Sequence, residues 1–314
     1  MDDKRARLRR TQQPPQSARS ARAKHLVAGV AVILVTVLLS TCRSVTHVEA
    51  VPAALTDAGS SRFASIGPYA VEQARAEFLG TYGCTLEFET YRPVARSHGS
   101  IAGAAGLERS ETMVFLAHGF MRDLTRMRGW GERFASHGVP TTVLSFCNSR
   151  FYAGRHDRNA EDLVALAAAV HAGPVVYAGF SAGGLAAYLA TAADPRAVAY
   201  LGLDPVDSGQ LAHDVRLDVP ALMMFAEPSR CNAQGNFIDS IGEQSTTGGR
   251  SNRILEVPNA THCDFEDPYD PRCERLCGAV EPPAVAETIR SAIRAWATEW
   301  LVATVRPARE LSSR

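Results

Sequence analysis

Lysine is almost absent from this 314-residue sequence, and its two lysines, Lys4 and Lys24, both lie near the start. Aromatic residues make up only 7% of the chain, and one long apolar run stands out. The first 42 residues hold eight of the 33 basic residues and only two aspartates. From residue 43 onward 31 acidic residues therefore face 25 arginines, and this mildly acidic body argues against a nucleic acid as partner. The length fits one large α/β domain with appendages.

The long apolar run covers residues 26–39, directly after a basic segment. A run of this length suits the core of a signal peptide better than a membrane span. Residues 39–42, Leu-Ser-Thr-Cys, also resemble the box that ends in the lipid-bearing cysteine of bacterial lipoproteins. Cleavage with secretion, lipidation at Cys42 and an uncleaved anchor all stay open.

These features divide the chain into three parts. Residues 1–42 are a basic N-terminus with a signal or anchor segment, within which residues 26–42 are a candidate membrane tether. Residues 43–61 are polar, rich in Ala, Thr and Ser, and predict a flexible linker. Residues 62–314 form a single folded domain. We expect an exported protein that is periplasmic, attached to the cell envelope or secreted.

Six cysteines follow Cys42, and an even number in an exported chain predicts disulfides. Four of them lie after residue 228, so we predict pairing within that group, which leaves the two earlier cysteines for each other. The late group is Cys231, Cys263, Cys273 and Cys277, and the earlier pair is Cys84 and Cys147. The last two cysteines have the spacing of metal ligands but no matching pair of histidines, so zinc is not expected.

Short apolar runs of β type alternate with helical segments along the chain. Strands are predicted at residues 86–91, 113–117, 141–146, 197–203, 220–226 and 253–257, and one more begins at residue 175 and stops at Gly179. Helices are predicted at residues 125–137, 158–171, 182–193 and 285–302, with a lead-in segment at 63–83 and a long polar loop at 227–250. This alternation is typical of an α/β fold, in which helices cover both faces of a mostly parallel central sheet.

Residues 179–183 read Gly-Phe-Ser-Ala-Gly between an apolar strand and an Ala/Leu-rich helix. Strand, Gly-x-Ser-x-Gly and helix together are the pattern of a nucleophile elbow. The glycines leave room for strand and helix at a turn that strains the serine backbone. An ordinary glycine-rich turn is the alternative, and the flanking elements favour Ser181 as a catalytic nucleophile.

A serine hydroxyl becomes nucleophilic beside a base that a carboxylate orients. In the chain order serine, acid, histidine, only His213 and His262 lie downstream of both the serine and Asp204. His262 follows the last predicted strand and has the better reach. Asp204 directly follows an apolar strand and is the first choice for the acid. Asp207, three residues later, and Glu227, at the end of the next strand, stay open.

Residues 118–120, His-Gly-Phe, directly follow the predicted strand 113–117. In proteins with a nucleophile elbow, two main-chain amides bind the oxyanion: one comes from such a loop and the other from the residue after the serine. We therefore expect the amides of Phe120, or alternatively Met121, and of Ala182 to bind the oxyanion. His118 is expected to be structural. The four residues that stand just past predicted strand ends, where reactive groups gather, are His118, Ser181, Asp204 and His262.

These motifs, in this order, resemble the chlorophyllase-like α/β-hydrolases. The resemblance covers roughly residues 113–267 and is carried by residues 118–120, 179–184, 203–207 and the loop around His262. The Leu-Asp-Pro of residues 203–205 is also similar to the pancreatic-lipase type. The resemblance implies an α/β-hydrolase fold, ester hydrolysis, and a catalytic triad of Ser181, Asp204 and His262. Phe180 and Ala182 flank the serine where chlorophyllases usually have histidine and arginine, so chlorophyll is not the expected substrate.

The sequence thus predicts a lipase-like or esterase-like serine hydrolase whose single catalytic domain acts on a small-molecule or lipid-like ester. The mechanism needs no metal and no organic cofactor. Two other classes stay open. One is a catalytically silent scaffold of the same fold that binds a ligand or an envelope partner, and the other is an acyltransferase or peptidase, because a fold does not fix the acceptor.

Overall fold

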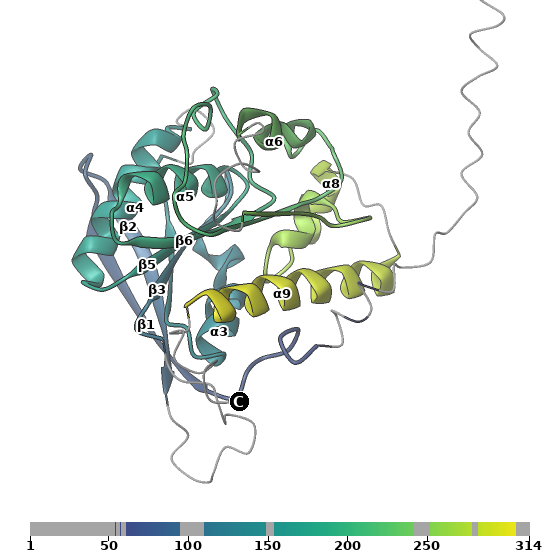
Figure 1. The fold of residues 1–314 in the computed structure, drawn as a ribbon, viewed down its shortest axis with the longest axis horizontal. Helices are drawn as coiled ribbons and strands as arrows, with labels where there is room; N and C mark the ends of the chain where they lie inside the picture. The colour runs from purple at the N-terminus through teal and green to yellow at the C-terminus, as the bar shows by residue number, and fades with distance from the viewer. Residues whose placement is uncertain are drawn as a thin grey trace, which may run out of the picture. The chain divides into compact units, whose positions relative to one another are not determined.

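The computed structural model describes residues 54, 57, 61–94, 110–148, 154–241, 252–277 and 282–305. Within them, eight strands form one sheet: β1 (Ala70–Leu79), β2 (Thr85–Val94), β3 (Met113–Ala117), β4 (Thr141–Ser145), β5 (Val175–Phe180), β6 (Ala197–Leu203), β7 (Ala221–Phe225) and β8 (Arg253–Glu256). Their order across the sheet is β1-β2-β4-β3-β5-β6-β7-β8 (Figure 1). The six strands from β4 to β8 in this order run parallel, whereas at one edge β2 is antiparallel to β4 and β1 is antiparallel to β2.

Helices cover both faces of this sheet, as the alternation in the sequence predicts. The longer ones are α3 (Arg128–Ser136), α4 (His156–Val170), α5 (Ala182–Ala193) and α9 (Pro283–Val305). Along β3, Val114 and Leu116 pack with α3 and α9, while Phe115 packs with α4 and α5. Because both faces are buried, the central strands are apolar throughout rather than alternating. The fold is therefore α/β with a mostly parallel sheet.

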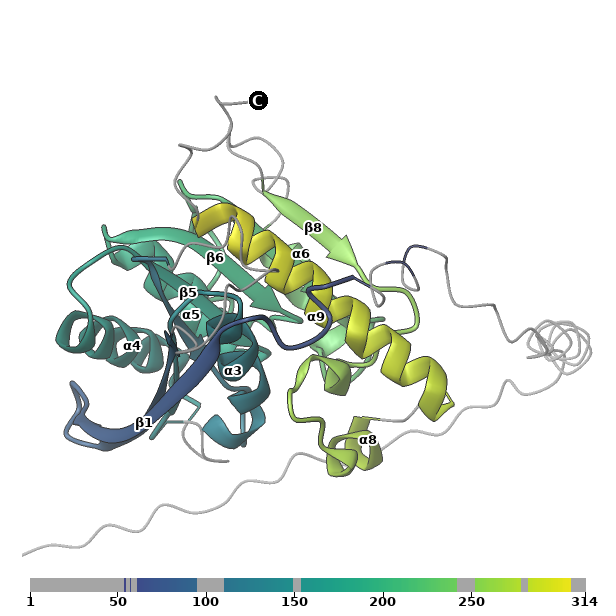
Figure 2. The same cartoon turned by 90° about the horizontal axis from the view of Figure 1, so that it is seen from below.

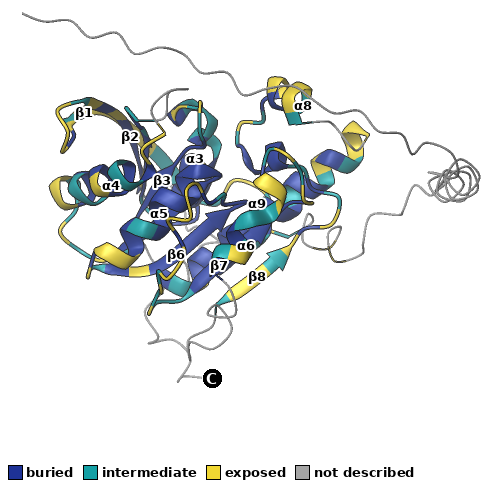
Figure 3. Ribbon diagram, turned by 90° about the horizontal axis from the view of Figure 1, so that it is seen from above, coloured by how far each residue is buried: buried dark blue, intermediate teal, exposed yellow. Residues whose placement is uncertain are grey.

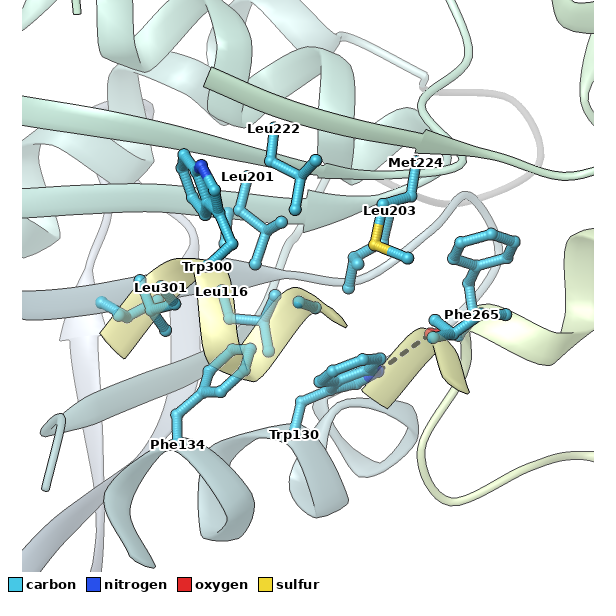
Figure 4. Packing of buried hydrophobic residues seen from close by; sticks show 14 of the residues in the cluster. Leu116, Trp130, Phe134, Leu201, Leu203, Leu222, Met224, Phe265, Trp300 and Leu301 are labelled. Carbon is cyan, nitrogen blue, oxygen red and sulfur yellow. Dashed lines mark hydrogen bonds between the residues drawn. The ribbon is translucent and has the colours of Figure 1, made fainter. Parts of the chain in front are cut away.

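One of the two apolar layers also holds the segment that follows β8 (Figure 4). Trp130 and Phe134 of α3 face leucines of the central strands, and Trp300 comes from α9. The indole Nε1 of Trp130 donates a hydrogen bond of 2.9 Å to the carbonyl oxygen of Phe265. This bond anchors the loop around His262 to the core.

The interpretation of residues 63–83 as a lead-in segment is wrong, because Ala70–Leu79 form strand β1. Residues 72–77 of this strand are exposed on both faces, so no apolar alternation marks them (Figure 3). β1 and β8 lie at opposite edges of the sheet (Figure 2). The predicted polar loop 227–250 likewise contains α6 (Asn236–Ile241), and α8 (Pro271–Cys277) was not predicted. Both helices are short, and short helices lack a readable period.

Three disulfides join Cys84 to Cys147, Cys231 to Cys277 and Cys263 to Cys273. The predicted grouping of the cysteines is confirmed. Such bonds indicate an oxidising, extracytoplasmic environment. The predicted signal or anchor segment, residues 1–42 with Cys42, lies outside the described residues. No helix in the described part of the chain has both the length and the apolar character to cross a membrane.

Candidate active site

Three side chains from distant parts of the chain meet beyond the C-terminal ends of β5, β6 and β8. The hydroxyl oxygen Oγ of Ser181 lies 3.0 Å from Nε2 of His262, and Nδ1 of the same ring lies 2.5 Å from Oδ2 of Asp204. All three side chains are buried. A hydroxyl bonded to an imidazole, which is bonded in turn to a carboxylate, is the arrangement of a serine-histidine-aspartate triad. The structure thus brings together the three residues that the motifs single out.

Ser181 occupies the sharp turn between β5 and α5, with φ 55° and ψ −127°. A positive φ costs a residue other than glycine on the order of 1–3 kcal/mol, so the surrounding structure must hold it. The Ser181 amide donates to the carbonyl of Leu203 at 3.0 Å, and its carbonyl accepts from the amide of Gly184 at 2.9 Å. A Cβ at position 179 would lie 2.2 Å from the Gly183 carbonyl oxygen, so Gly179 is required there.

Asp204 is fully buried, and three donors fix its carboxylate. The amide of Ala226 donates to Oδ1 at 3.0 Å, and Nδ2 of Asn232 lies 3.4 and 3.3 Å from the two oxygens. The third donor is the imidazole of His262. With Oδ1 occupied by a main-chain amide, Oδ2 is the oxygen that receives the ring N–H.

The alternative acids and the alternative base have other partners. Asp207 is buried, but its Oδ1 accepts from the amide of Leu211 at 3.0 Å, so it caps a local turn. Glu227 is exposed, and its Oε1 accepts from the amide of Asn259 at 3.2 Å. The side chain of His213 is 62% exposed and lies against Asp214. None of these three described side chains contacts the imidazole of the site.

The loop after β3 passes directly beside Ser181. A Cβ on Gly119 would lie 3.1 Å from the Cβ of the serine. The Arg122 amide donates to the carbonyl of Gly119 at 3.2 Å, which closes a four-residue turn. Met121, at the third position, has φ 58°, the sign that a type II turn requires there. This turn presents the segment predicted to supply one oxyanion amide.

Two amides next to the serine remain available as donors. Across the described backbone, the N–H groups of Phe120 and Ala182 donate to no main-chain oxygen outside regular elements. Ala182 begins α5, and the first amides of a helix have no intrahelical acceptor. Main-chain donors beside a nucleophile can stabilise negative charge that develops on a substrate oxygen.

The buried ring of His118 supports this loop instead of joining the serine. Its Nδ1 donates to the carbonyl of Gly119 at 2.7 Å, and its Nε2 accepts from the amide of Phe146 at 2.9 Å. Burial lowers the pKa of His118 to about 4, although the bond to Gly119 acts in the opposite direction. The ring is therefore neutral near pH 7. This agrees with its hydrogen bonds, because only a neutral imidazole can donate from one nitrogen and accept at the other.

The loop that carries His262 is held on both sides. The ring of Phe180 packs against the imidazole with 4.6 Å between ring centroids. Asp264 accepts from the amide and the hydroxyl of Thr261 at 2.8 Å each, and Nη1 of Arg290 lies 3.1 Å from its other oxygen. Burial raises the pKa of Asp264, while these donors lower it. The imidazole thus extends from a braced turn.

Asn232 is a site residue that the sequence analysis missed. It is fully buried and donates to the Glu227 carbonyl at 3.0 Å besides contacting Asp204. Only its position beside Cys231 in a polar loop could have drawn attention to it. The disulfide from Cys231 to Cys277 fixes that loop, and the disulfide from Cys263 to Cys273 fixes the loop of the histidine.

Both disulfides end on α8, which brings three sulfur atoms close together. Cys263, Cys273 and Cys277 have their Sγ atoms within 4.8 Å of one another. Each of these sulfurs is bonded to another cysteine, so none offers the thiolate that a metal ion binds. The cluster braces the site.

Comparison of the chain with protein-family models finds no match, and comparison with curated proteins finds no match either. A hydroxyl, an imidazole and a carboxylate are joined by hydrogen bonds, and the amides of Phe120 and Ala182 in the two adjoining segments have no main-chain acceptor outside regular elements. This set can activate an alcohol as a nucleophile and stabilise an anionic intermediate.

Proposed function

We propose that this protein is an exported serine hydrolase of the α/β-hydrolase type that cleaves carboxylic esters. The observation that carries the proposal is the hydrogen-bonded line from Ser181 through His262 to Asp204. The strained turn of the serine and the parallel sheet beneath it support the assignment to this type. The three disulfides support export, with residues 1–42 as the leader or anchor.

The reaction begins with attack of the Ser181 hydroxyl oxygen on the ester carbonyl carbon. Its proton moves to Nε2 of His262, 3.0 Å away, while the imidazolium that forms keeps its bond from Nδ1 to Asp204. The carbonyl oxygen becomes an oxyanion, and the amides of Phe120 and Ala182 bind it. His262 then gives the proton to the leaving alcohol, and an acyl-serine remains.

Water completes the cycle with the same residues. His262 takes a proton from the water as it attacks the acyl-serine, and the second tetrahedral intermediate uses the same two amides. Its collapse releases the carboxylic acid and returns the proton to Ser181. No metal or organic cofactor takes part in either half of this mechanism.

Turnover of p-nitrophenyl acetate by Ser181→Ala tests the proposal. Removing a triad nucleophile lowers kcat on the order of 10⁴- to 10⁶-fold, so we expect a loss in that range. Ser208→Ala is the matched control, because Ser208 is exposed and lies four residues beyond Asp204. Wild-type turnover that persists unchanged in Ser181→Ala contradicts the proposal.

A further inference from the structure

The turn that presents the Phe120 amide ends at Arg122, and the side chain of Arg122 contacts the segment that follows His262. Its Nη1 donates a hydrogen bond of 3.2 Å to Oδ2 of Asp270. Its Nε lies 2.8 Å from Oε1 of Glu266. The two groups form an ion pair, but the N–H group does not point at the oxygen as a hydrogen bond requires. A single guanidinium therefore joins the two loops that meet at the serine.

This junction lies almost entirely inside the protein. The side chain of Arg122 is 19% exposed, and those of Glu266 and Asp270 are 0% and 5% exposed. Nη2 of Arg126 lies 3.5 Å from Oδ2 of Asp270 and is the other cation of the group. Buried carboxylates are stable only beside cations or hydrogen-bond donors. Arg122 is the cation that contacts both acids, while Asp270 also accepts a hydrogen bond of 3.0 Å from the amide of Arg272.

The electrostatics link the junction to the imidazole. Burial raises the pKa of Glu266 to about 7, whereas Arg122, Arg126 and His262 lower it, and Asp270 adds to the rise. Glu266 therefore lies close enough to the imidazole for the two groups to interact electrostatically.

The turn itself needs an external support. Met121 adopts φ 58° without being glycine, and such a conformation persists only where the surroundings hold it. The main-chain bond that closes the turn is 3.2 Å long, and the side chain of Met121 is 59% exposed, so it contributes little packing. His118 holds the turn from its N-terminal side, through the bond to Gly119, and the anchored side chain of Arg122 attaches its C-terminal end to the segment after His262.

We propose that Arg122 is a positioning residue, which holds the turn bearing the Phe120 amide against the loop of His262 through Glu266 and Asp270. The inference rests on the proposed function, because it assigns these two loops to one reaction. Arg122 does not touch the substrate. It sets the distance between the oxyanion donor and the base, so its loss acts on kcat more than on KM.

Arg122→Gln should lower kcat for p-nitrophenyl acetate on the order of 10- to 100-fold, with KM changed less than about twofold. Arg122→Lys should lie between wild type and Arg122→Gln, because an ammonium cannot hold two carboxylates as the guanidinium fork does. Arg128→Gln is the matched control. Arg128 also pairs with a buried carboxylate, with its Nε 2.8 Å from Oε2 of Glu89, and its side-chain hydrogen bonds go to that residue and not to either loop.

Hydrogen exchange of the peptide that covers residues 119–122 supplies a readout that does not need turnover. We expect exchange at least about tenfold faster in Arg122→Gln than in wild type or Arg128→Gln, because the turn opens more often. Unchanged exchange, or a raised KM with unchanged kcat, overturns the inference. If Arg122→Gln does not fold, Arg122→Lys decides in the same way. A wild type without ester turnover refutes the proposed function, while the exchange result still decides the role of Arg122.

Discussion

Replacing Asp204 with asparagine changes one atom in the centre of the site. Oδ1 of Asp204 accepts from the amide of Ala226 at 3.0 Å, so the asparagine must keep an oxygen in that place. Its NH₂ group then occupies the position of Oδ2 and faces Nδ1 of His262. Because NH₂ can only donate, Nδ1 must become the acceptor and the ring proton moves to Nε2.

This tautomer disables the base. Nε2 lies 3.0 Å from the hydroxyl oxygen of Ser181, and a protonated Nε2 cannot accept the serine proton. The same NH₂ group also faces the donor Nδ2 of Asn232, which lies 3.3 Å from Oδ2 in the native protein. In enzymes with this triad, the equivalent change lowers kcat on the order of 10⁴-fold, or about 5.5 kcal/mol.

The assay is p-nitrophenyl acetate turnover at pH 7 to 8, with circular dichroism to verify folding of each variant. Asp207→Asn and Glu227→Gln are the matched controls, since neither carboxylate contacts the imidazole. Both controls should retain kcat within about tenfold of wild type. The reasoning is refuted if Asp204→Asn stays within that range, or if either control loses as much as Asp204→Asn.

Three further predictions concern the oxyanion amide, the disulfides and pH. Phe120→Pro removes the amide at a turn position that favours proline, so its kcat should fall at least about 100-fold below that of Phe120→Ala, which keeps the amide. Equal rates would exclude Phe120 as a donor. Replacing Cys84 and Cys147 by serine should cost about 4 kcal/mol of unfolding free energy in urea, for a separation of 63 residues, with kcat nearly unchanged. The same change at Cys263 and Cys273, 10 residues apart, should cost about 3 kcal/mol and also lower kcat, because it frees the loop of His262. Equal effects on kcat would contradict this role. Because the pKa of Glu266 rises from 4.5 to about 7 on folding, its contribution to stability is full below pH 4.5 and is lost as pH rises through 7. Glu266→Gln should flatten that decline in thermal melts between pH 4.5 and 8, and an unaltered decline would show that another group causes it.

The parts of the fold that follow from the sequence are those with a strong local pattern. Residues 113–117 and the run that begins at residue 175 lack polar alternation because both faces of the sheet are buried, and the structure confirms both strands as β3 and β5. Strand β1 escaped prediction because its exposed residues 72–77, Glu-Gln-Ala-Arg-Ala-Glu, carry no large apolar side chain on either face. The periodicity of apolar residues in a sequence reflects which side chains are buried. An exposed edge strand buries few side chains and therefore shows little periodicity.

In the site, too, the residues with a local sequence pattern are predictable and those without one are not. Ser181 is marked by its glycines, and His262 and Asp204 by their places after strands. The choice between Asp204, Asp207 and Glu227 stayed open, because it depends on which carboxylate reaches the ring in three dimensions. The bonds from Asn232 and from Arg122 join residues 28 and 148 positions apart. Such contacts between polar loops leave no periodic trace in one sequence.

The most direct test of the central claim is to locate the adduct of a fluorophosphonate probe by tandem mass spectrometry. The probe reacts with a serine only where a base activates it and an oxyanion site receives its phosphoryl oxygen. We predict one adduct, on Ser181, whose formation slows at least about 100-fold in His262→Ala. No adduct on the folded protein, or an adduct at another serine, would contradict the account.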